Sequence, residues 1–155
     1  MNRDPRVIFK LKLKQRCAEL IEKRMQSART AINDAQQAAN NEQKSSAGDK
    51  YETSRAMSHL EKDMHARQLA ENLRELSALK AIDVNTIYIS GNTGAFLKCS
   101  PCSFFIGAGL GKQELDLGTV FFLSPNAPLA KLLQQKKVGD LFVFNNMELR
   151  IVEIF

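Results

Sequence analysis

The chain has 155 residues, of which 44% are hydrophobic, so it is long enough for one ordinary domain or two small ones. It contains no run of about 18 apolar residues, and charged residues occur from its first positions, so we expect neither a transmembrane helix nor a secretory signal. Three cysteines are an odd number, and they do not indicate a disulfide scaffold. We therefore expect a cytoplasmic protein that does not contact a membrane.

The net charge of +5 lies entirely in the first third of the chain. Residues 1–50 contain 11 Lys and Arg against 6 Asp and Glu, and the remaining residues contain 11 of each sign. The excess is densest between Arg3 and Arg29. Such a basic stripe suggests a polyanionic partner, although a solvated helix face is the simpler explanation, because Lys and Arg are good helix formers.

Residues 8 to 80 are predicted to form two long helices. Pro5 is the only proline before Pro101, and Gly48 is the only glycine before Gly91. In the first helix, apolar residues recur at alternating steps of three and four, as in a coiled-coil seam, at Ala18, Ile21, Met25, Ala28, Ile32, Ala35 and Ala39. The second helix has a similar series, in which the step from Met64 to Leu69 breaks the rhythm: Met57, Leu60, Met64, Leu69, Leu73, Leu76 and Leu79. The polar stretch 40–49 is predicted to be the turn between them.

After residue 83 the pattern changes to short β-branched and aromatic runs separated by Gly, Pro, Asn and Asp. We expect strands at 86–90, 94–99, 103–106, 119–123, 141–144 and 149–154, and one short helix at 127–133. Asn145-Asn146 is typical of a tight hairpin turn. The sequence therefore predicts an α+β protein with two domains, residues 1–82 and residues 83–155.

Two stretches resemble the Gre family of transcript-cleavage factors. Gly48-Asp49 followed by Glu52 matches the acidic pattern that the family carries at the turn of its helical hairpin. The stretch 123–140 contains Ser-Pro, a short helix and Lys-Val-Gly-Asp, and is similar to the family's C-terminal signature. The resemblance implies a long antiparallel coiled-coil hairpin with its tip near residues 43–52. It also implies a C-terminal FKBP-like β-sheet domain with one short helix.

The resemblance also implies a function. In the family, the hairpin enters the secondary channel of RNA polymerase, and the tip acids help to hold a Mg²⁺ that is shared with the polymerase active site. Asp49 and Glu52 would take this role, and the polymerase itself would cleave backtracked RNA. The chain would then be a transcription elongation factor and not an enzyme. It would bind no cofactor alone and no small-molecule substrate, and it would meet the RNA 3′ end and DNA only through the polymerase.

Further residues are assigned from the resemblance and from the charge pattern. Ser124, Pro125 and Leu129 lie in the segment matching the family's polymerase-binding domain, and we also expect Leu129 in the core. From the basic stripe, we assign Lys10, Lys14 and Arg24 to face nucleic acid.

Several alternatives stay open from the residues themselves. Asp49 and Glu52 also form a capping-box-like pattern that would only begin a helix. Arg55 stands where the family usually has an acid, which favours a secondary-channel regulator that does not cleave RNA. A different class is an FKBP-like prolyl isomerase or chaperone, which requires an aromatic-lined pocket. The candidate aromatic residues for it are Phe104, Phe105, Phe121, Phe122, Phe142 and Phe144. A plain coiled-coil adaptor would leave the acidic pair without a function.

Two further motifs are weak signals. Cys99 and Cys102 form a single C-x-x-C, whereas a structural zinc site needs four ligands, so we expect turn or core cysteines. The glycine-rich stretch 107–111 lacks the following helix of a dinucleotide-binding unit, and we expect a loop there.

Overall fold

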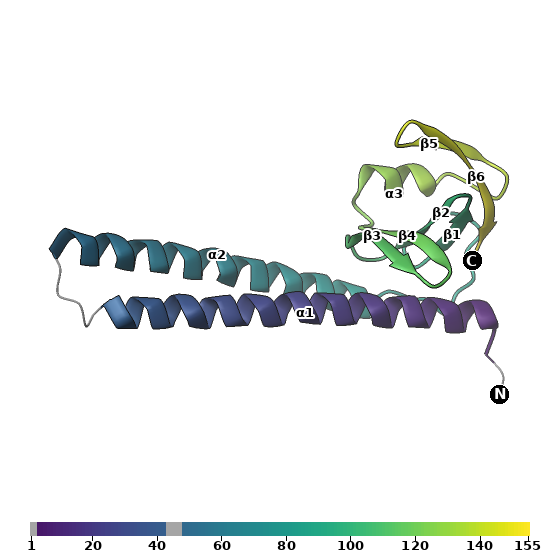
Figure 1. The fold of residues 1–155 in the computed structure, drawn as a ribbon. Coiled ribbons are helices and arrows are strands. Elements are labelled where there is room, and N and C mark those ends of the chain that lie inside the picture. The colour runs from purple at the N-terminus through teal and green to yellow at the C-terminus, as the bar shows by residue number, and fades with distance from the viewer. Residues whose placement is uncertain (1–2, 43–47) are drawn as a thin grey trace. The chain divides into compact units, whose positions relative to one another are not determined.

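The computed structural model describes residues 3–42 and 48–155, with side chains at 3–41 and 52–155. Two long helices precede a six-stranded sheet (Figure 1), which confirms the predicted α+β class. The helices are α1 (Pro5–Glu42), α2 (Gly48–Lys80) and α3 (Pro128–Leu133). The strands are β1 (Phe96–Cys99), β2 (Cys102–Ile106), β3 (Gly111–Leu115), β4 (Gly118–Leu123), β5 (Leu141–Phe144) and β6 (Met147–Ile154).

The chain divides into two compact units. The sheet unit comprises Met1–Ala18 and Ala78–Phe155, and the helix-pair unit comprises Glu19–Ser77. The first turns of α1 therefore belong to the same unit as the sheet. The domain boundary expected between residues 82 and 83 stays a prediction. Among the described residues, no helix is both long and apolar enough to cross a membrane.

The helix α1 begins at a local cap and buries one narrow stripe. The Asp4 carboxylate accepts a hydrogen bond from the Arg6 amide at 2.9 Å, and Pro5 occupies the first turn, where a missing N–H costs nothing. The buried positions recur every three or four residues, which is the helical period, except where the half-buried Ile32 stands between Ala28 and Ala35. They are Val7, Lys10, Leu13, Cys17, Ile21, Met25, Ala28, Ala35 and Ala39.

Within the helix-pair unit, α1 and α2 run antiparallel, but α2 does not use the predicted apolar seam. Met57, Leu60, Met64 and Leu73 are 46–66% exposed. The half-buried positions of α2 are largely polar, namely Ser54, Ser58, Lys62, His65, Leu69, Asn72 and Glu75. Lys62 Nζ donates to Gln36 Oε1 at 2.7 Å across the two helices. The predicted seam is therefore wrong for most of α2, because polar side chains occupy the phase that faces α1.

The sheet has the strand order β3-β4-β2-β1-β6-β5, with β2 and β4 parallel and all other neighbours antiparallel. The hairpin between β5 and β6 turns at Asn145 and Asn146, whose φ angles of 50° and 63° suit a two-residue turn. Two expectations differ from the structure. Residues 86–90 form no strand, whereas β3, which begins at the end of the glycine-rich stretch, was missed because its residues are mostly polar.

Both faces of the central strands are covered, so adjacent phenylalanines point into different layers. Phe104 packs with Phe121, Phe142 and Phe144 on the face that also carries α3. Phe105 contacts Phe122 at 6.0 Å between ring centroids. Phe9 of α1 lies 4.8 Å from Phe96 and 5.9 Å from Phe155, measured between ring centroids. Burial on both faces explains why these strands contain continuous apolar runs.

Candidate functional site

The acidic pair lies at the start of α2. Asp49 is the second residue of the helix, and its side chain lies outside the described residues, as does most of the predicted tip near 43–52. Glu52 lies three positions further along the helix and is exposed. Residues three apart lie on one side of a helix, and a carboxylate near a helix N-terminus is stabilised by the helix dipole. Glu52 is therefore free to meet another molecule in solution.

The carboxylates of this pair are suitable ligands for Mg²⁺, which prefers oxygen and commonly takes one or two carboxylates from a protein while it keeps several waters. The described side chains contain no group of three or more His, Cys, Asp or Glu that is arranged to hold a metal ion. A metal at Glu52 would therefore need further oxygen ligands from Asp49, from water or from a binding partner.

Lys10, which was assigned to nucleic acid, is completely buried in the sheet unit. Its Nζ donates to the backbone oxygen of Thr86 at 2.6 Å and lies 4.8 Å from the centroid of the Tyr88 ring. Burial lowers the pKa of Lys10 from its usual 10.5 to about 8, and the nearby Asp83 carboxylate opposes that shift. In this position the ammonium holds the loop after α2 and has no exposed surface for a phosphate.

The loop that receives Lys10 is organised by Asp83. Its carboxylate accepts hydrogen bonds from the Thr86 hydroxyl and from the Asn85 amide, and these bonds lower the pKa of Asp83. The Tyr88 hydroxyl donates to the backbone oxygen of Asp83 at 2.9 Å. Sequence reasoning missed this arrangement. The Asp-x-x-Thr spacing signals a local turn, but it does not identify a distant lysine as its partner.

Lys14 lies one turn after Lys10 and also binds backbone oxygens. Its Nζ donates to the oxygen of Lys80 at 3.1 Å and to that of Ile82 at 2.8 Å. These carbonyls lie at and just after the C-terminus of α2, where helical carbonyls lack partners and a cation is favoured by the dipole. Lys14 is half-buried and caps that helix end.

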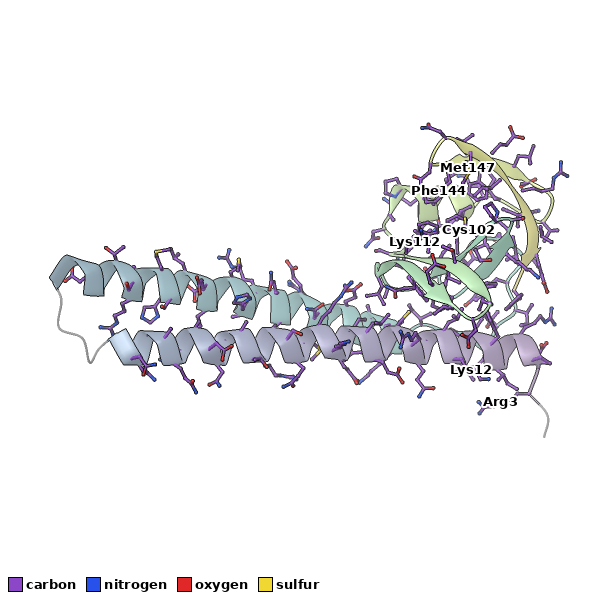
Figure 2. All side chains as sticks on the ribbon, viewed as in Figure 1. Arg3, Lys12, Cys102, Lys112, Phe144 and Met147 are labelled. Carbon is purple, nitrogen blue, oxygen red and sulfur yellow. The ribbon has the colours of Figure 1, made fainter. Side chains whose placement is uncertain are left out.

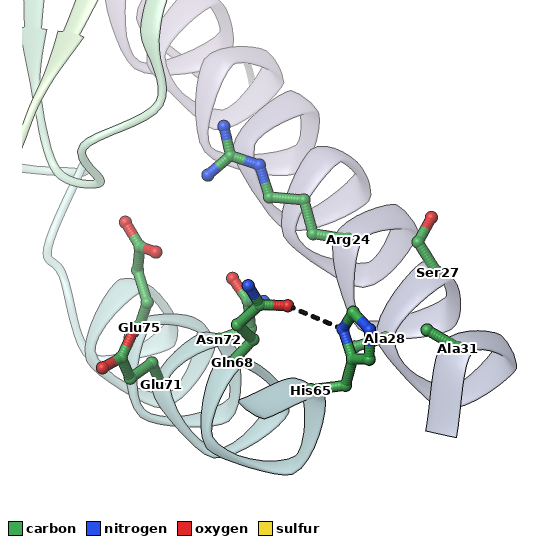
Figure 3. Close-up of a pocket in the computed structure, with 9 residues that line it drawn as sticks. All are labelled: Arg24, Ser27, Ala28, Ala31, His65, Gln68, Glu71, Asn72 and Glu75. Carbon is green, nitrogen blue, oxygen red and sulfur yellow. Dashed lines mark hydrogen bonds between the residues drawn. The ribbon is translucent and has the colours of Figure 1, made fainter. Parts of the chain in front are cut away.

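Arg24, the third assigned cation, is exposed in the helix-pair unit and lines a groove of about 480 Å³. Figure 3 shows Arg24 and Ala28 from α1 on one side, with His65, Glu71 and Glu75 from α2 on the other. His65 Nδ1 lies 3.1 Å from Gln68 Oε1. Two carboxylates in the groove reduce the positive potential around Arg24, which weakens the attraction of this position for a phosphate.

The proposed polymerase-binding residues lie between β4 and α3. Ser124 and Pro125 are half-buried in a turn, in which the Ala127 amide donates to the Ser124 backbone oxygen at 3.0 Å. Leu129 packs against the core of the sheet unit, as its apolar character suggested. Ser124 and Pro125 therefore keep surface for a partner, whereas Leu129 contributes mainly to packing.

Cys99 and Cys102 are free, buried thiols at the ends of β1 and β2. Burial raises the pKa of both, to about 12 for Cys99, which also lies near Cys102. Because the thiolate is the reactive form, a high pKa gives these cysteines little reactivity near neutral pH.

An aromatic-lined cavity lies in the sheet unit. Its volume is about 270 Å³, and Phe9, Phe96 and Phe155 line it together with Cys99 and Pro101. Lys98 and Glu153, which lie opposite each other on β1 and β6, add charged groups to its lining. The six phenylalanines proposed from the sequence for such a pocket do not line this cavity, and four of them, Phe104, Phe105, Phe122 and Phe142, belong to the buried core (Figure 2 shows the side chains of this unit).

Comparison of the sequence with models of protein families gave no match, and comparison with curated proteins gave none.

Proposed function

We propose that this chain is a transcription elongation factor of the Gre type, which binds RNA polymerase and stimulates the polymerase's own cleavage of backtracked RNA. One observation carries the proposal: the Gly48-Asp49-x-x-Glu52 pattern lies at the start of the second of two long antiparallel helices, and Glu52 is exposed there. The order of two long helices followed by a β-sheet is the order that this class requires.

In this proposal the helix pair is a coiled-coil hairpin, and the C-terminal β-sheet is FKBP-like. The Asp49 and Glu52 carboxylates hold a Mg²⁺ that is shared with the polymerase active site. There the metal would supply charge stabilisation for phosphodiester hydrolysis. The chain contributes the two ligands and their placement, and the polymerase contributes the remaining catalytic groups.

The polymerase-binding surface is proposed at Ser124 and Pro125, with Leu129 holding that segment in place from the core. Among the three cations assigned to nucleic acid, Arg24 has the side chain with the most solvent exposure. A contact from Arg24 to phosphate would make binding weaken as salt concentration rises.

The test uses a backtracked elongation complex of RNA polymerase with 3′-labelled RNA, to which wild-type protein, Asp49→Asn or Glu52→Gln is added. We expect wild-type protein to release short 3′ fragments and each variant to slow this release by about 100-fold, the scale of losing a positioned electrostatic group. Asp63→Asn and Glu61→Gln are matched controls, because both acids are exposed on α2 away from its start. They should stimulate the release of 3′ fragments by the polymerase as the wild type does.

Binding is measured in the same complexes, for example by fluorescence anisotropy of labelled protein. Binding without cleavage by the wild type would replace the proposal with a secondary-channel regulator that does not cleave RNA, the alternative favoured by Arg55. A wild-type protein that does not bind polymerase would overturn both functions.

A second candidate function rests on the aromatic-lined cavity. Phe9, Phe96 and Phe155 give this cavity an aromatic wall, which is what an FKBP-like prolyl isomerase or chaperone needs. Isomerisation of a proline-containing test peptide, lost in Phe155→Ala and kept in Glu52→Gln, would support this function. Equal rates with and without the protein would exclude it.

A further inference from the structure

The two edge strands of the sheet differ in how they are protected against pairing with another chain. At one edge, β3 carries exposed Lys112 and Glu114, whose side chains are 3.6 Å apart. At the other edge, β5 has the sequence Leu-Phe-Val-Phe, without a charge, a proline or a glycine. Charged residues and prolines are the usual means by which proteins prevent pairing at an exposed edge. The β5 edge lacks both.

The backbone of β5 presents its free hydrogen-bonding groups at two residues. The Ile151 amide donates to the Asp140 oxygen at 3.0 Å, and the Ile151 oxygen accepts from the Gly139 amide at 2.8 Å, so a bulge at residues 139 and 140 directs the Asp140 carbonyl toward β6. Backbone directions alternate along a strand, and Phe142 and Phe144 therefore bond toward β6. The N–H and C=O groups of Leu141 and Val143 point away from β6. Within the described residues, no strand pairs with that side of β5 (Figure 1).

The side chains of the same two residues form an apolar strip on the outer face. Leu141 is 43% exposed and Val143 is 65% exposed. In the register of β5 and β6, Leu141 lies opposite Arg150, and Val143 lies opposite Glu148. On β6, the neighbour of Leu141 is therefore basic and the neighbour of Val143 is acidic.

We propose that β5 pairs with β5 of a second copy of this chain, antiparallel and around a two-fold axis at Phe142. In this register Leu141 lies opposite Val143 of the partner subunit, and Val143 lies opposite Leu141 of the partner subunit. Both pairs consist of residues whose backbone groups point outward, so each pair exchanges two hydrogen bonds. The two-fold axis also makes the contact self-limiting at two copies.

Charge complementarity favours a second copy as the occupant of this edge. In the joined sheet, side chains on one face line up across the four strands in rows. One row consists of Arg150 and Leu141 of one chain, followed by Val143 and Glu148 of the partner subunit. The other row is its symmetry mate. Apolar residues meet in the middle of each row, and no like charges are opposed. The unlike charges at the two ends of a row are three strand spacings, or about 14 Å, apart. The strand is only four residues long, so the contact is smaller than a standard interface of about 1,600 Å² and the dimer is weak.

The first test is sedimentation equilibrium of the full chain over protein concentrations from about 10 μM to about 1 mM, the range of a weak dimer. The weight-average mass should rise from 17.4 kDa toward twice that value. Val143→Lys should keep the protein monomeric throughout. Val152→Lys is the matched control, because Val152 is 55% exposed on β6, away from the edge, and it should dimerise like the wild type. A constant mass of 17.4 kDa for the wild type, or equal loss in both variants, would overturn the proposal.

The second test checks the register and does not depend on a charged substitution. Leu141→Cys and Val143→Cys chains are oxidised separately and as a mixture at high concentration. The native cysteines are buried and should not compete. Cross-linked dimers should form mainly in the mixture, because only there do two new thiols lie opposite each other. Equal cross-linking in the separate samples would overturn the proposed pairing. This inference does not depend on the proposed function in transcription.

Discussion

Lys10 shows how the environment changes the role of a residue that sequence assigns to a charged surface. The side chain is fully buried, and its ammonium has one carbonyl partner and one aromatic ring. Burial of a charge is costly, and here it lowers the pKa of Lys10 to about 8. The charged form is therefore retained near neutral pH at a cost in stability.

The lowered pKa predicts a pH dependence of stability. Between about pH 8 and pH 10 the unfolded chain, with an ordinary lysine pKa of 10.5, binds more protons at this position than the folded chain. The contribution of Lys10 to the free energy of unfolding therefore rises with pH in this window, by at most about 1.4 kcal/mol per pH unit.

Lys10→Met should remove this contribution, so its stability relative to wild type should fall as pH rises through the window. Urea unfolding at several pH values measures the effect. The exposed Lys12→Met is the control and should follow the wild type. Parallel curves for the two variants would show that burial of Lys10 has no such consequence.

Gly91 is required by close packing between two segments. A Cβ at this position would lie 2.4 Å from the backbone oxygen of Leu133 in α3, and the Gly91 amide donates to that same oxygen at 3.0 Å. Gly91→Ala should therefore destabilise the sheet unit by about 1–3 kcal/mol, the cost of forcing extra volume into a packed site. Chemical denaturation measures this loss. The neighbouring exposed Asn92→Ala should change stability by much less.

Among the secondary-structure elements, α2 differs most from what its apolar spacing predicts. Its apolar residues have helical spacing, but Met57, Leu60 and Met64 lie on the exposed side. At the C-terminal end of the helix, Leu76 and Leu79 are buried. The half-buried, mostly polar positions further along α2 continue the three-and-four spacing of these two leucines, so they lie on the same side of the helix.

Two leucines of α2 test this phase directly. Leu60 is 66% exposed and Leu76 is 8% exposed. We expect Leu76→Ala to lower the free energy of unfolding by about 2–4 kcal/mol, and Leu60→Ala by less than about 0.5 kcal/mol. Thermal or urea unfolding followed by helical circular dichroism measures both. Similar losses in the two variants would instead support the apolar seam expected from the sequence.

At the scale of the whole molecule, the sheet unit includes the first 18 residues of the chain. Phe9 packs on Phe96 and Phe155, and Lys10 and Lys14 bind the chain between residues 80 and 86. Contacts between segments so distant in sequence are decided by folding, and no local pattern identifies them.

Because the sheet unit consists of residues 1–18 and 78–155, we expect it to fold without the helix pair between them. A chain in which residues 19–77 are replaced by a short Gly-Ser linker should keep a folded sheet with a cooperative thermal transition. Residues 78–155 alone should lose it, because Phe96 and Phe155 would be exposed to water. Near-ultraviolet circular dichroism and calorimetry distinguish the two cases. Cooperative unfolding of residues 78–155 at an unchanged temperature would contradict the prediction.

The α+β fold class could be predicted from the sequence, because periodicity and the placement of Gly and Pro are local signals. They predicted two long helices, a later β-rich part, the hairpin at Asn145-Asn146 and the short helix that ends at Leu133. The acidic pair was also visible as a local pattern at a helix start. The sequence did not predict the phase of α2, the burial of Lys10, the capping role of Lys14 or the edge position of β5. These features depend on which distant segments meet, and burial changes the cost of a charge or an apolar surface only after they have met.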